Sequence, residues 1–440
     1  MGIFTAKGHV VLPGHKEETK NKQPLIYSLK AEEKVYLPLV NPRGLPNQVL
    51  VKVGDTIKKG QKVMLRTDFY VPLYAPVSGV VLENEKRYNA VTGRPTDHLV
   101  IAANGSKEVA KNQFLKGDYQ KATRQEVIEA IKEAGIVGLG GAGFPTFIKY
   151  QTDKPIECVL INGVECEPYL TTDYLAMKEY VHKVVVGTDM LVKAGDAPRA
   201  IIAIKVKKEP LPELYKEALI DFPHITLVEV PDLYPMGWEK RLVKEVFNRT
   251  YEKLPIECGV IINNSQTAIA VFDALTNGQP ITEKLITVAG DGVVNPTNIL
   301  VPVGLPVCEI IAACGGYLGD EITLIAGGPM TGKPISNDDF VIQTAMNGLT
   351  VLKPLKHSAQ FVDCLRCGDC TAHCPAHLQP VEIKRALDRR DFDHLEKLRP
   401  FDCVECGICS YVCPSKLEIT DAVRRAKTML QFHLNRKAKK

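Results

Sequence analysis

Two cysteine motifs near the C-terminus constrain this chain more than any other feature. Residues 364–375 read CLRCGDCTAHCP and residues 403–414 read CVECGICSYVCP, so the spacing C-x2-C-x2-C-x3-C-P occurs twice. Three cysteines at this spacing lie on one tight loop. The proline after the fourth fixes φ and donates no N–H, so the backbone takes a new direction there. These motifs hold eight of the thirteen cysteines in a long chain without a secretory signal pattern, which indicates metal binding rather than disulfides.

The repeated spacing predicts two 4Fe–4S clusters. In two-cluster ferredoxins the fourth cysteine of each motif ligates the other cluster. The predicted sets are therefore Cys364, Cys367, Cys370 and Cys413 for the first cluster, and Cys374, Cys403, Cys406 and Cys409 for the second. Zinc is the alternative metal, but it favours two separated C-x2-C pairs and does not explain two repeats of four cysteines. Helical periodicity in residues 381–398 predicts an α-helical ferredoxin module over residues 355–430.

The rest of the chain predicts a multidomain α/β protein. Residues 1–115 contain short apolar runs between Gly and Pro, which favours small antiparallel strands, and residues 51–81 resemble a biotinyl/lipoyl-type barrel. The hairpin expected to carry a lysine in such a barrel reads TDFYVPLY, so this barrel-sandwich-like domain is interpreted as a packing module. Residues 116–280 begin with a capping box at Thr123 and Glu126 and then alternate helices with buried strands, as in a layered α/β domain. Short strands with Gly-rich turns follow in residues 281–340.

Composition excludes some function classes. The chain is 45% hydrophobic with a formal net charge of +4, and it has no basic stripe interleaved with aromatic residues. We therefore expect no nucleic-acid partner. The most apolar stretch, 301–318, contains Pro306, Glu309 and two glycines and is interpreted as core rather than as a membrane span.

A glycine-rich segment, residues 138–146 (GLGGAGFPT), is a candidate cofactor loop. It contains Gly138-x-Gly140-x-x-Gly143, the dinucleotide pattern, but a helix precedes it where that pattern requires a strand. We therefore reject the Rossmann interpretation. Two interpretations remain open: a tight turn with glycine for steric reasons, or a loop whose amides approach a phosphate before the next helix.

An acidic turn follows the next predicted strand. Asn162 ends the strand CVLIN, and Glu165 and Glu167 lie on the turn that leaves it. Two carboxylates at a strand end can bind ribose hydroxyls or can simply be solvated. The residues alone leave both alternatives open.

Together, the loop and the turn resemble the flavin- and NADH-binding subunit of respiratory complex I. Residues 140–146 and Lys149 match its loop pattern, and the acidic turn matches through Asn162, Glu165, Glu167 and Pro168. Asn263 and Asn264 match an asparagine pair, and residues 284–336 look like its β-grasp-like domain. The chain departs from the pattern at Leu139, where arginine is usual, at Val164, where aspartate is usual, and at 237–240, where G-E-E-T becomes GWEK.

The order of the domains resembles the RnfC family, a component of the Rnf complexes, over essentially the whole chain. This resemblance implies non-covalent FMN, NAD(H) as substrate, and electron flow through two 4Fe–4S clusters. The residues that it implies for FMN and NAD(H) are Gly138, Gly140, Gly141, Gly143, Phe144, Lys149, Asn162, Glu165, Glu167, Asn263 and Asn264. Phe144 is expected to stack on the nicotinamide, Lys149 to contact the flavin phosphate and Glu167 to hold a ribose hydroxyl.

The resemblance also implies partners and a location. We expect a peripheral subunit at the cytoplasmic face of the cell membrane, held there by the other subunits of an ion-translocating ferredoxin:NAD oxidoreductase and exchanging electrons with ferredoxin through them. Two alternatives stay open. One is a corrinoid reductase of a microcompartment, which resembles this chain in its flavin and cluster motifs. The other is a flavin-free iron–sulfur relay, suggested by the departures at Leu139 and Val164.

Overall fold

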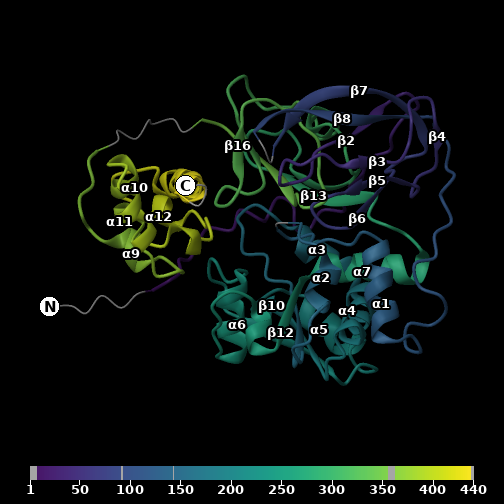
Figure 1. The fold of residues 1–440 in the computed structure, drawn as a ribbon, viewed down its shortest axis with the longest axis horizontal. Coiled ribbons are helices and arrows are strands. Elements are labelled where there is room, and N and C mark those ends of the chain that lie inside the picture. The colour runs from purple at the N-terminus through teal and green to yellow at the C-terminus, as the bar shows by residue number, and fades with distance from the viewer. Residues whose placement is uncertain (1–6, 91–92, 142, 355–361, 438–440) are drawn as a thin grey trace.

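The computed structural model describes residues 7–90, 93–141, 143–354 and 362–437. Figure 1 shows a β-rich part above an α/β part, with the cysteine module beside both and joined to them by a long connection. The predicted multidomain α/β class is confirmed. Among the helices within these described ranges, none combines the length and apolar character needed to cross a bilayer.

The N-terminal module consists of two small antiparallel sheets, β2-β8-β7-β4 and β3-β5-β6. The strands are β2 (Lys34–Pro38), β3 (Gln48–Val49), β4 (Thr56–Ile57), β5 (Lys62–Arg66), β6 (Val71–Tyr74), β7 (Gly79–Asn89) and β8 (Arg94–Ala103). Alternating apolar residues turn one face inward, and Val35, Met64 and Ile101 are fully buried there. The β5–β6 hairpin packs on the next domain, because the Tyr74 hydroxyl donates to the Glu133 carbonyl.

The central domain is a parallel sheet, β11-β10-β9-β12, covered by helices. Its strands are β9 (Cys158–Asn162), β10 (Ala200–Lys205), β11 (Ile225–Val230) and β12 (Val260–Asn264). Its helices are α1 (Arg124–Glu133), α2 (Thr146–Tyr150), α3 (Thr172–Glu179), α4 (Val181–Gly195), α5 (Leu211–Ala218), α6 (Glu239–Phe247), the 3-10 turn η1 (Pro255–Cys258) and α7 (Ser265–Asn277). The predicted capping box of Thr123 and Glu126 begins α1. Because β9 and β12 are parallel neighbours, Asn162 and Asn264 end side by side at the carboxyl edge of the sheet.

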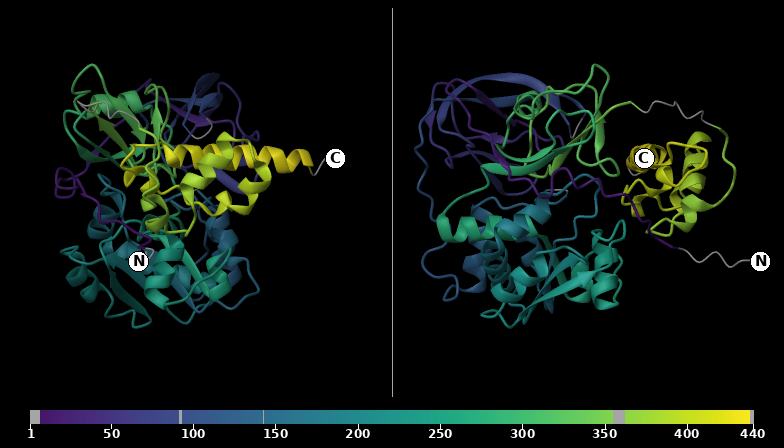
Figure 2. Two further views of the ribbon diagram at one scale, coloured as in Figure 1. Left: turned by 90° about the vertical axis from the view of Figure 1, so that its left-hand side faces the viewer. Right: turned by 180° about the vertical axis from the view of Figure 1, so that it is seen from behind.

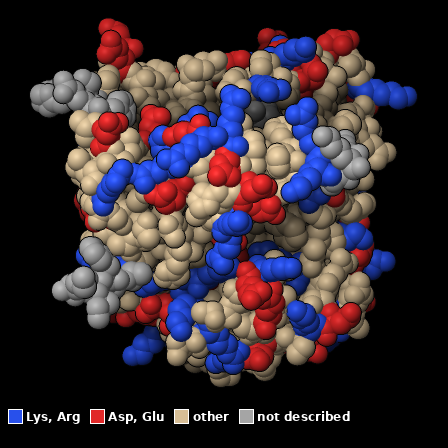
Figure 3. All heavy atoms as spheres, turned by 60° about the vertical axis from the view of Figure 1, so that its left-hand side comes forward, with Lys and Arg blue, Asp and Glu red and all other residues tan. Residues whose placement is uncertain are grey.

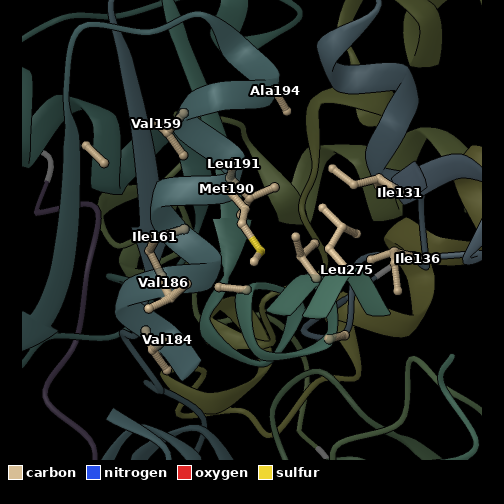
Figure 4. Packing of buried hydrophobic residues seen from close by; sticks show 14 of the residues in the cluster. Ile131, Ile136, Val159, Ile161, Val184, Val186, Met190, Leu191, Ala194 and Leu275 are labelled. Carbon is tan, nitrogen blue, oxygen red and sulfur yellow. The ribbon is translucent and has the colours of Figure 1, made fainter. Parts of the chain in front are cut away.

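One apolar cluster holds this domain together. Figure 4 shows Met190 and Leu191 of α4 facing Ile131 of α1 across the cluster, with Leu275 of α7 between them. Helices α4 and α7 approach very closely, because a Cβ on Gly187 would lie 2.0 Å from the Ala268 carbonyl oxygen. The helices therefore hold the edge of the sheet in a fixed place.

The third part is a six-stranded mixed sheet, β1-β14-β13-β17-β15-β16. Its elements are β1 (Leu25–Ile26), β13 (Glu283–Ala289), β14 (Thr297–Pro302), α8 (Val307–Ala313), β15 (Thr323–Ala326), β16 (Lys333–Ile335) and β17 (Gly348–Leu352). The sheet takes strands from both sides of the predicted 281–340 range. Strand β1 adds to its edge by pairing with β14, and β17 is inserted between β13 and β15.

The cysteine module is a compact group of helices. They are α9 (Asp369–Ala372), α10 (Pro380–Asp388), α11 (Phe392–Lys397), the 3-10 turn η2 (Pro400–Asp402), α12 (Ile408–Tyr411) and α13 (Ile419–Lys437). Ile383 of α10, Leu395 of α11 and Val423 of α13 form its apolar centre. Figure 2 shows the end of α13 projecting from the body of the molecule. The first residues of the predicted 355–430 range, 355–361, lie outside the described residues.

An N-terminal strap, residues 7–26, crosses all of these parts except the small barrel. Lys7 N–H donates to Ala372 O of the cysteine module at 2.8 Å, and Val10 pairs with Tyr234 of the α/β domain. The Lys16 ammonium then donates to Glu165 O at 2.8 Å. Over the face drawn in Figure 3, Lys and Arg are interspersed with Asp and Glu, so charges there interact pairwise rather than as a field of one sign.

Candidate functional site

The eight motif cysteines surround two separate spaces. Cys364, Cys367, Cys370 and Cys413 line a cavity of about 330 Å³. Cys374, Cys403, Cys406 and Cys409 line a second, much smaller cavity of about 20 Å³. Each cavity thus takes three cysteines from one motif and the fourth from the other. The crossing arises because α9 and α12 lie against each other and carry Cys374 and Cys413 away from their own loops.

The donor chemistry at these cavities fits iron–sulfur clusters. Burial raises the pKa of the Cys406 thiol to about 12 and that of Cys409 to about 11, so the thiolate form needs a cationic centre beside it. Among the described residues, no three Cys, His, Asp or Glu side chains converge tightly enough for one metal ion. A zinc ion with Zn–S bonds of about 2.3 Å requires such convergence, whereas a cubane holds its thiolates farther apart.

The glycine loop, residues 138–146, closes as a turn between α1 and α2. Gly138 N–H donates to Phe144 O at 2.9 Å, and Val137 and Pro145 form a bridge. Two side chains hold its backbone from behind: Thr267 Oγ1 accepts from Leu139 N–H at 3.1 Å, and Lys284 Nζ donates to Leu139 O at 3.0 Å. Only the described residues Gly140 and Gly141 of this loop reach the large cavity.

That cavity has a volume of about 730 Å³ and lies where the α/β domain, the six-stranded sheet and the cysteine module meet. Its walls come from six segments: residues 140–141, 162–173, 234–238, 326–333, 343–347 and 404–406. The size is within the usual range for a cofactor pocket. Cys406, a residue of the second cysteine set, lines this same cavity.

Asn162 and Glu165 lie on the acidic turn and are fixed by it. Asn162 Oδ1 accepts from Val164 N–H at 3.0 Å, and its Nδ2 donates to Gly237 O at 2.9 Å. Glu165 is buried, and its Oε1 accepts from Asp173 N–H at 2.9 Å. Its carboxylate lies 3.7 Å from the ammonium of Lys16, so strap and turn form a buried ion pair. The turn is therefore a constructed wall and not a solvated corner.

A buried polar network continues behind the turn. Asp173 accepts from Asn264 Nδ2 at 2.9 Å and from Gln266 Nε2 at 2.7 Å, and Gln266 Oε1 accepts from Lys284 Nζ at 2.9 Å. Burial raises the pKa of Asp173 and lowers the pKa of Lys284, because both groups are completely enclosed. Strand β13 thus sends a lysine under the glycine loop of the neighbouring domain.

Glu167 is engaged by the protein itself. Its Oε1 accepts from the backbone N–H groups of Met330 at 2.7 Å and Thr331 at 3.1 Å. These amides belong to the GGPMTGK loop, residues 327–333. Desolvation raises the pKa of the Glu167 carboxyl. The carboxylate that the resemblance assigns to a ribose hydroxyl is thus bound to a loop of the six-stranded sheet.

The structure brings together six of the eleven predicted flavin and NAD(H) residues. Those that line the cavity are Gly140, Gly141, Asn162, Glu165, Glu167 and Asn264, and those that do not are Gly138, Gly143, Phe144, Lys149 and Asn263.

The side chains that turn away have identifiable reasons. The Lys149 ammonium donates to Ile262 O at 2.7 Å, and Asn263 Nδ2 donates to Tyr150 OH at 2.7 Å. Phe144 packs edge-on against Phe69 of the barrel. The expected N-terminal anion site of the next helix is also corrected, because Thr146 N–H donates to Ile136 O and α2 has five residues.

Several residues at this site were missed by sequence reasoning. Asp173, Tyr234 and Trp238 line the cavity, and Lys284 lies behind its glycine wall. The GGPMTGK loop was visible as a Gly-rich turn, but nothing placed it opposite the glycine loop. A signal for Lys284 existed: it alternates with Ile286 and Val288, which share one buried face of β13.

Comparison with known proteins matches four domain families along the chain. Residues 4–106 match the RnfC barrel sandwich hybrid domain and residues 131–273 the Nuo51 FMN-binding domain. Residues 285–334 match the SLBB domain and residues 363–417 a 4Fe–4S dicluster domain.

Relatives match over nearly the full length. The RnfC component of the Na(+)-translocating ferredoxin:NAD(+) oxidoreductase complex of Acetobacterium woodii is 33% identical over 400 residues, 89% of each chain. The chain belongs to the RnfC family. The corresponding component of the proton-translocating complex of Clostridium ljungdahlii is 33% identical, covering 85% of this chain and 82% of that one. That of the ion-translocating oxidoreductase complex of Rhodobacter capsulatus is 32% identical, covering 90% and 77%.

Membership in the RnfC family confirms the predicted resemblance. Fold similarity extends to an NAD+-reducing [NiFe]-hydrogenase in its air-oxidized state, with a TM-score of 0.50 and 18% identity over 72% of this chain and 66% of that one. The FMN-binding and dicluster matches confirm FMN and 4Fe–4S as the cofactors of these domain families, and the dicluster match overturns the zinc alternative. The barrel match at 4–106 also favours the RnfC family over a corrinoid reductase, which lacks this N-terminal arrangement.

Proposed function

We propose that this chain is the electron-transfer subunit of an ion-translocating ferredoxin:NAD oxidoreductase complex, with FMN bound in its large cavity. One observation carries the proposal. Cys406 of the second cysteine set and Gly140 and Gly141 of the glycine loop line the same cavity of about 730 Å³. A flavin and a cluster held by these residues are close neighbours, as transfer of single electrons between them requires.

The walls of the cavity fit the two nucleotides. Gly140 and Gly141 allow a phosphate or ring to approach the backbone, because they present no side chain. Asn162 and Asn264, at the ends of adjacent parallel strands, offer amides at the edge where α/β sheets bind nucleotides. Bound FMN supplies the chemistry, a hydride exchange with NAD(H) and one-electron exchange with the clusters. The protein's residues position the cofactor and exclude water from it.

The two cysteine sets differ in exposure, and this supports an order. The second set lies at the large cavity. In the first set Cys367 is exposed, and the adjacent Leu365 is 65% exposed. We infer that electrons pass between flavin and second cluster inside the protein, and between first cluster and partner subunits at its surface. Those subunits hold the chain at the cytoplasmic face of the cell membrane and connect it to ferredoxin.

Anaerobic purification followed by iron, sulfide and flavin quantification tests this function. We expect about eight irons per chain, one non-covalent FMN and bleaching of the flavin by NADH. Eight irons with no flavin and no response to NADH would reduce the chain to a relay. Co-purification with integral membrane subunits separates the proposed complex from a corrinoid reductase, whose partner is a corrinoid enzyme.

A further inference from the structure

Glu167 connects three segments that are far apart in the sequence. It lies on the acidic turn of the α/β domain, and its Oε1 accepts from Met330 N–H and Thr331 N–H at 2.7 and 3.1 Å. Hydrogen bonds from amides to a carboxylate are stronger than those between neutral groups. The acidic turn and the GGPMTGK loop are therefore joined by two such bonds at one oxygen atom.

The fit between Glu167 and the loop leaves no free space. A Cβ on Gly328 would lie 2.1 Å from Glu167 Cγ, so residue 328 has to be glycine for the carboxylate to reach the amides beyond it. Glu167 is thus built into the junction, with its chain packed against the loop backbone.

The GGPMTGK loop in turn contacts the second cysteine loop, residues 403–409. A Cβ on Gly407 would lie 2.6 Å from Met330 O. Arg424 of α13 donates to Thr331 O at 3.3 Å and pairs with Glu405 at 3.0 Å. The loop that Glu167 holds is therefore the surface on which the second cysteine loop rests.

Tyr234 provides a second connection. Its hydroxyl donates to Cys406 O at 2.7 Å and lies 3.5 Å from Glu167 Oε2. The ring is buried, and its backbone pairs with Val10 of the strap. Cys406 is thus held at the cavity wall from the side of the α/β domain as well.

We propose that Glu167 is a positioning residue that fixes the second cysteine loop at the wall of the flavin cavity, with Tyr234 as its helper, instead of a ribose ligand. The proposal rests on the proposed function, in which one electron at a time passes between flavin and second cluster. In each transfer the donor is oxidised by one electron and the acceptor reduced by one, and no covalent bond forms or breaks. The rate of such a transfer falls steeply with distance, so the residues that set the distance set the rate.

The first test needs neither flavin nor NADH. Hydrogen–deuterium exchange is measured at Met330 and Thr331 in cluster-loaded, flavin-free protein. Glu167→Ala should raise exchange there by about tenfold or more, the factor expected for losing a hydrogen bond to a charged acceptor. Glu167→Gln keeps an acceptor oxygen and should restore much of the protection. Glu396→Gln, an exposed carboxylate change on α11, is the matched control and should change nothing.

The second test follows two steps in the flavin-loaded protein by stopped flow. In Glu167→Ala we expect NADH to bleach the flavin at the wild-type rate and at the same NADH concentration, while reduction of the clusters slows by about tenfold or more. Tyr234→Phe, which removes only the hydroxyl, should slow the same step to a smaller extent and shift the EPR signal of the second cluster. If Glu167→Ala loses its clusters, Glu167→Gln and Tyr234→Phe provide both measurements.

The opposite pattern overturns the proposal. A ribose ligand at residue 167 predicts weaker NADH binding and slower bleaching, with unchanged exchange at residues 330–331 and unchanged cluster reduction. Unchanged exchange or unchanged cluster reduction in Glu167→Ala is by itself sufficient to reject the positioning role. If wild-type protein does not bleach with NADH, the proposed function fails, whereas the exchange measurement still tests the junction.

Discussion

The side-chain amide of Asn264 occupies the place beside Gly140 that a Cβ would need. An ideal Cβ on residue 140 would lie 2.5 Å from Asn264 Nδ2. Asn264 cannot move away freely, because Nδ2 donates to Asp173 and Oδ1 accepts from Gln266 N–H, both at 2.9 Å. Its neighbour Gly141 has no atom within 4 Å of the equivalent position. Two adjacent glycines of one loop thus differ sharply in the space around them.

Gly140→Ala should therefore remove flavin without removing iron. The added methyl displaces Asn264 and its bond to Asp173, and overpacking of this kind costs about 1–3 kcal/mol. Flavin and iron per chain, together with the midpoint of thermal unfolding, give the result. Gly141→Ala is the matched control and should keep its flavin. Equal loss of flavin in both variants would show that the loop responds to any side chain.

The crossed cysteine sets predict which double variants lose one cluster. Cys374→Ser with Cys403→Ser removes two ligands of the same set, so we expect about four irons and one EPR-active cluster to remain. Cys374→Ser with Cys370→Ser removes one ligand from each set and should damage both clusters. Iron analysis and EPR of dithionite-reduced protein read the outcome. The reverse result would mean that each motif ligates its own cluster.

Lys284 should make the stability of the protein depend on pH. Its ammonium donates to Leu139 O and Gln266 Oε1, two uncharged acceptors, and burial lowers its pKa to about 7. An unfolded lysine keeps its proton to about pH 10.4. Between these values the unfolded chain binds more protons than the folded one, so stability rises with pH, by up to about 1.4 kcal/mol per pH unit.

Lys284→Met removes this dependence. The difference in thermal unfolding midpoint between wild type and variant, at one scan rate, should shift in favour of the wild type from about pH 7 to pH 9. Lys216→Met, at an exposed position on α5, is the control and should give a flat difference. A flat difference for Lys284→Met as well would mean that the buried lysine stays charged throughout this range.

Lys149→Met should retain flavin, because the ammonium is bonded to Ile262 O and does not line the cavity. The lost hydrogen bond should cost about 1–2 kcal/mol of stability and lower the unfolding midpoint. Flavin affinity is measured by titrating FMN into apoprotein. A large loss of affinity with unchanged stability would contradict this, and would mean that the lysine turns to a phosphate when FMN binds.

The cysteine sets were predictable from sequence, because spacing within a short motif determines which thiols can share one cluster. The same holds for Asn162 and Asn264, which end parallel strands and therefore meet at one edge. The opposite wall of the cavity was not predictable. The GGPMTGK loop and Tyr234 reach it through packing between domains, and no local pattern encodes that arrangement.

Lys149 and Phe144 show a different limit. Their positions match a family motif, yet the direction of each side chain depends on its neighbours. Lys149 finds a carbonyl of β12 close to its ammonium, and Phe144 finds Phe69 of a barrel. A motif therefore predicted the course of the backbone here better than it predicted what each side chain touches.

The N-terminal strap gives the chain an order of assembly. It leaves the ribosome first, but its contact with Ala372 waits for the last module to be synthesised. Contacts between such distant residues form late in folding. The cysteine loops are consequently accessible to iron–sulfur delivery before the strap, Tyr234 and Glu167 enclose Cys406. Cluster insertion thus precedes docking, and the completed junction then protects the second cluster from oxygen.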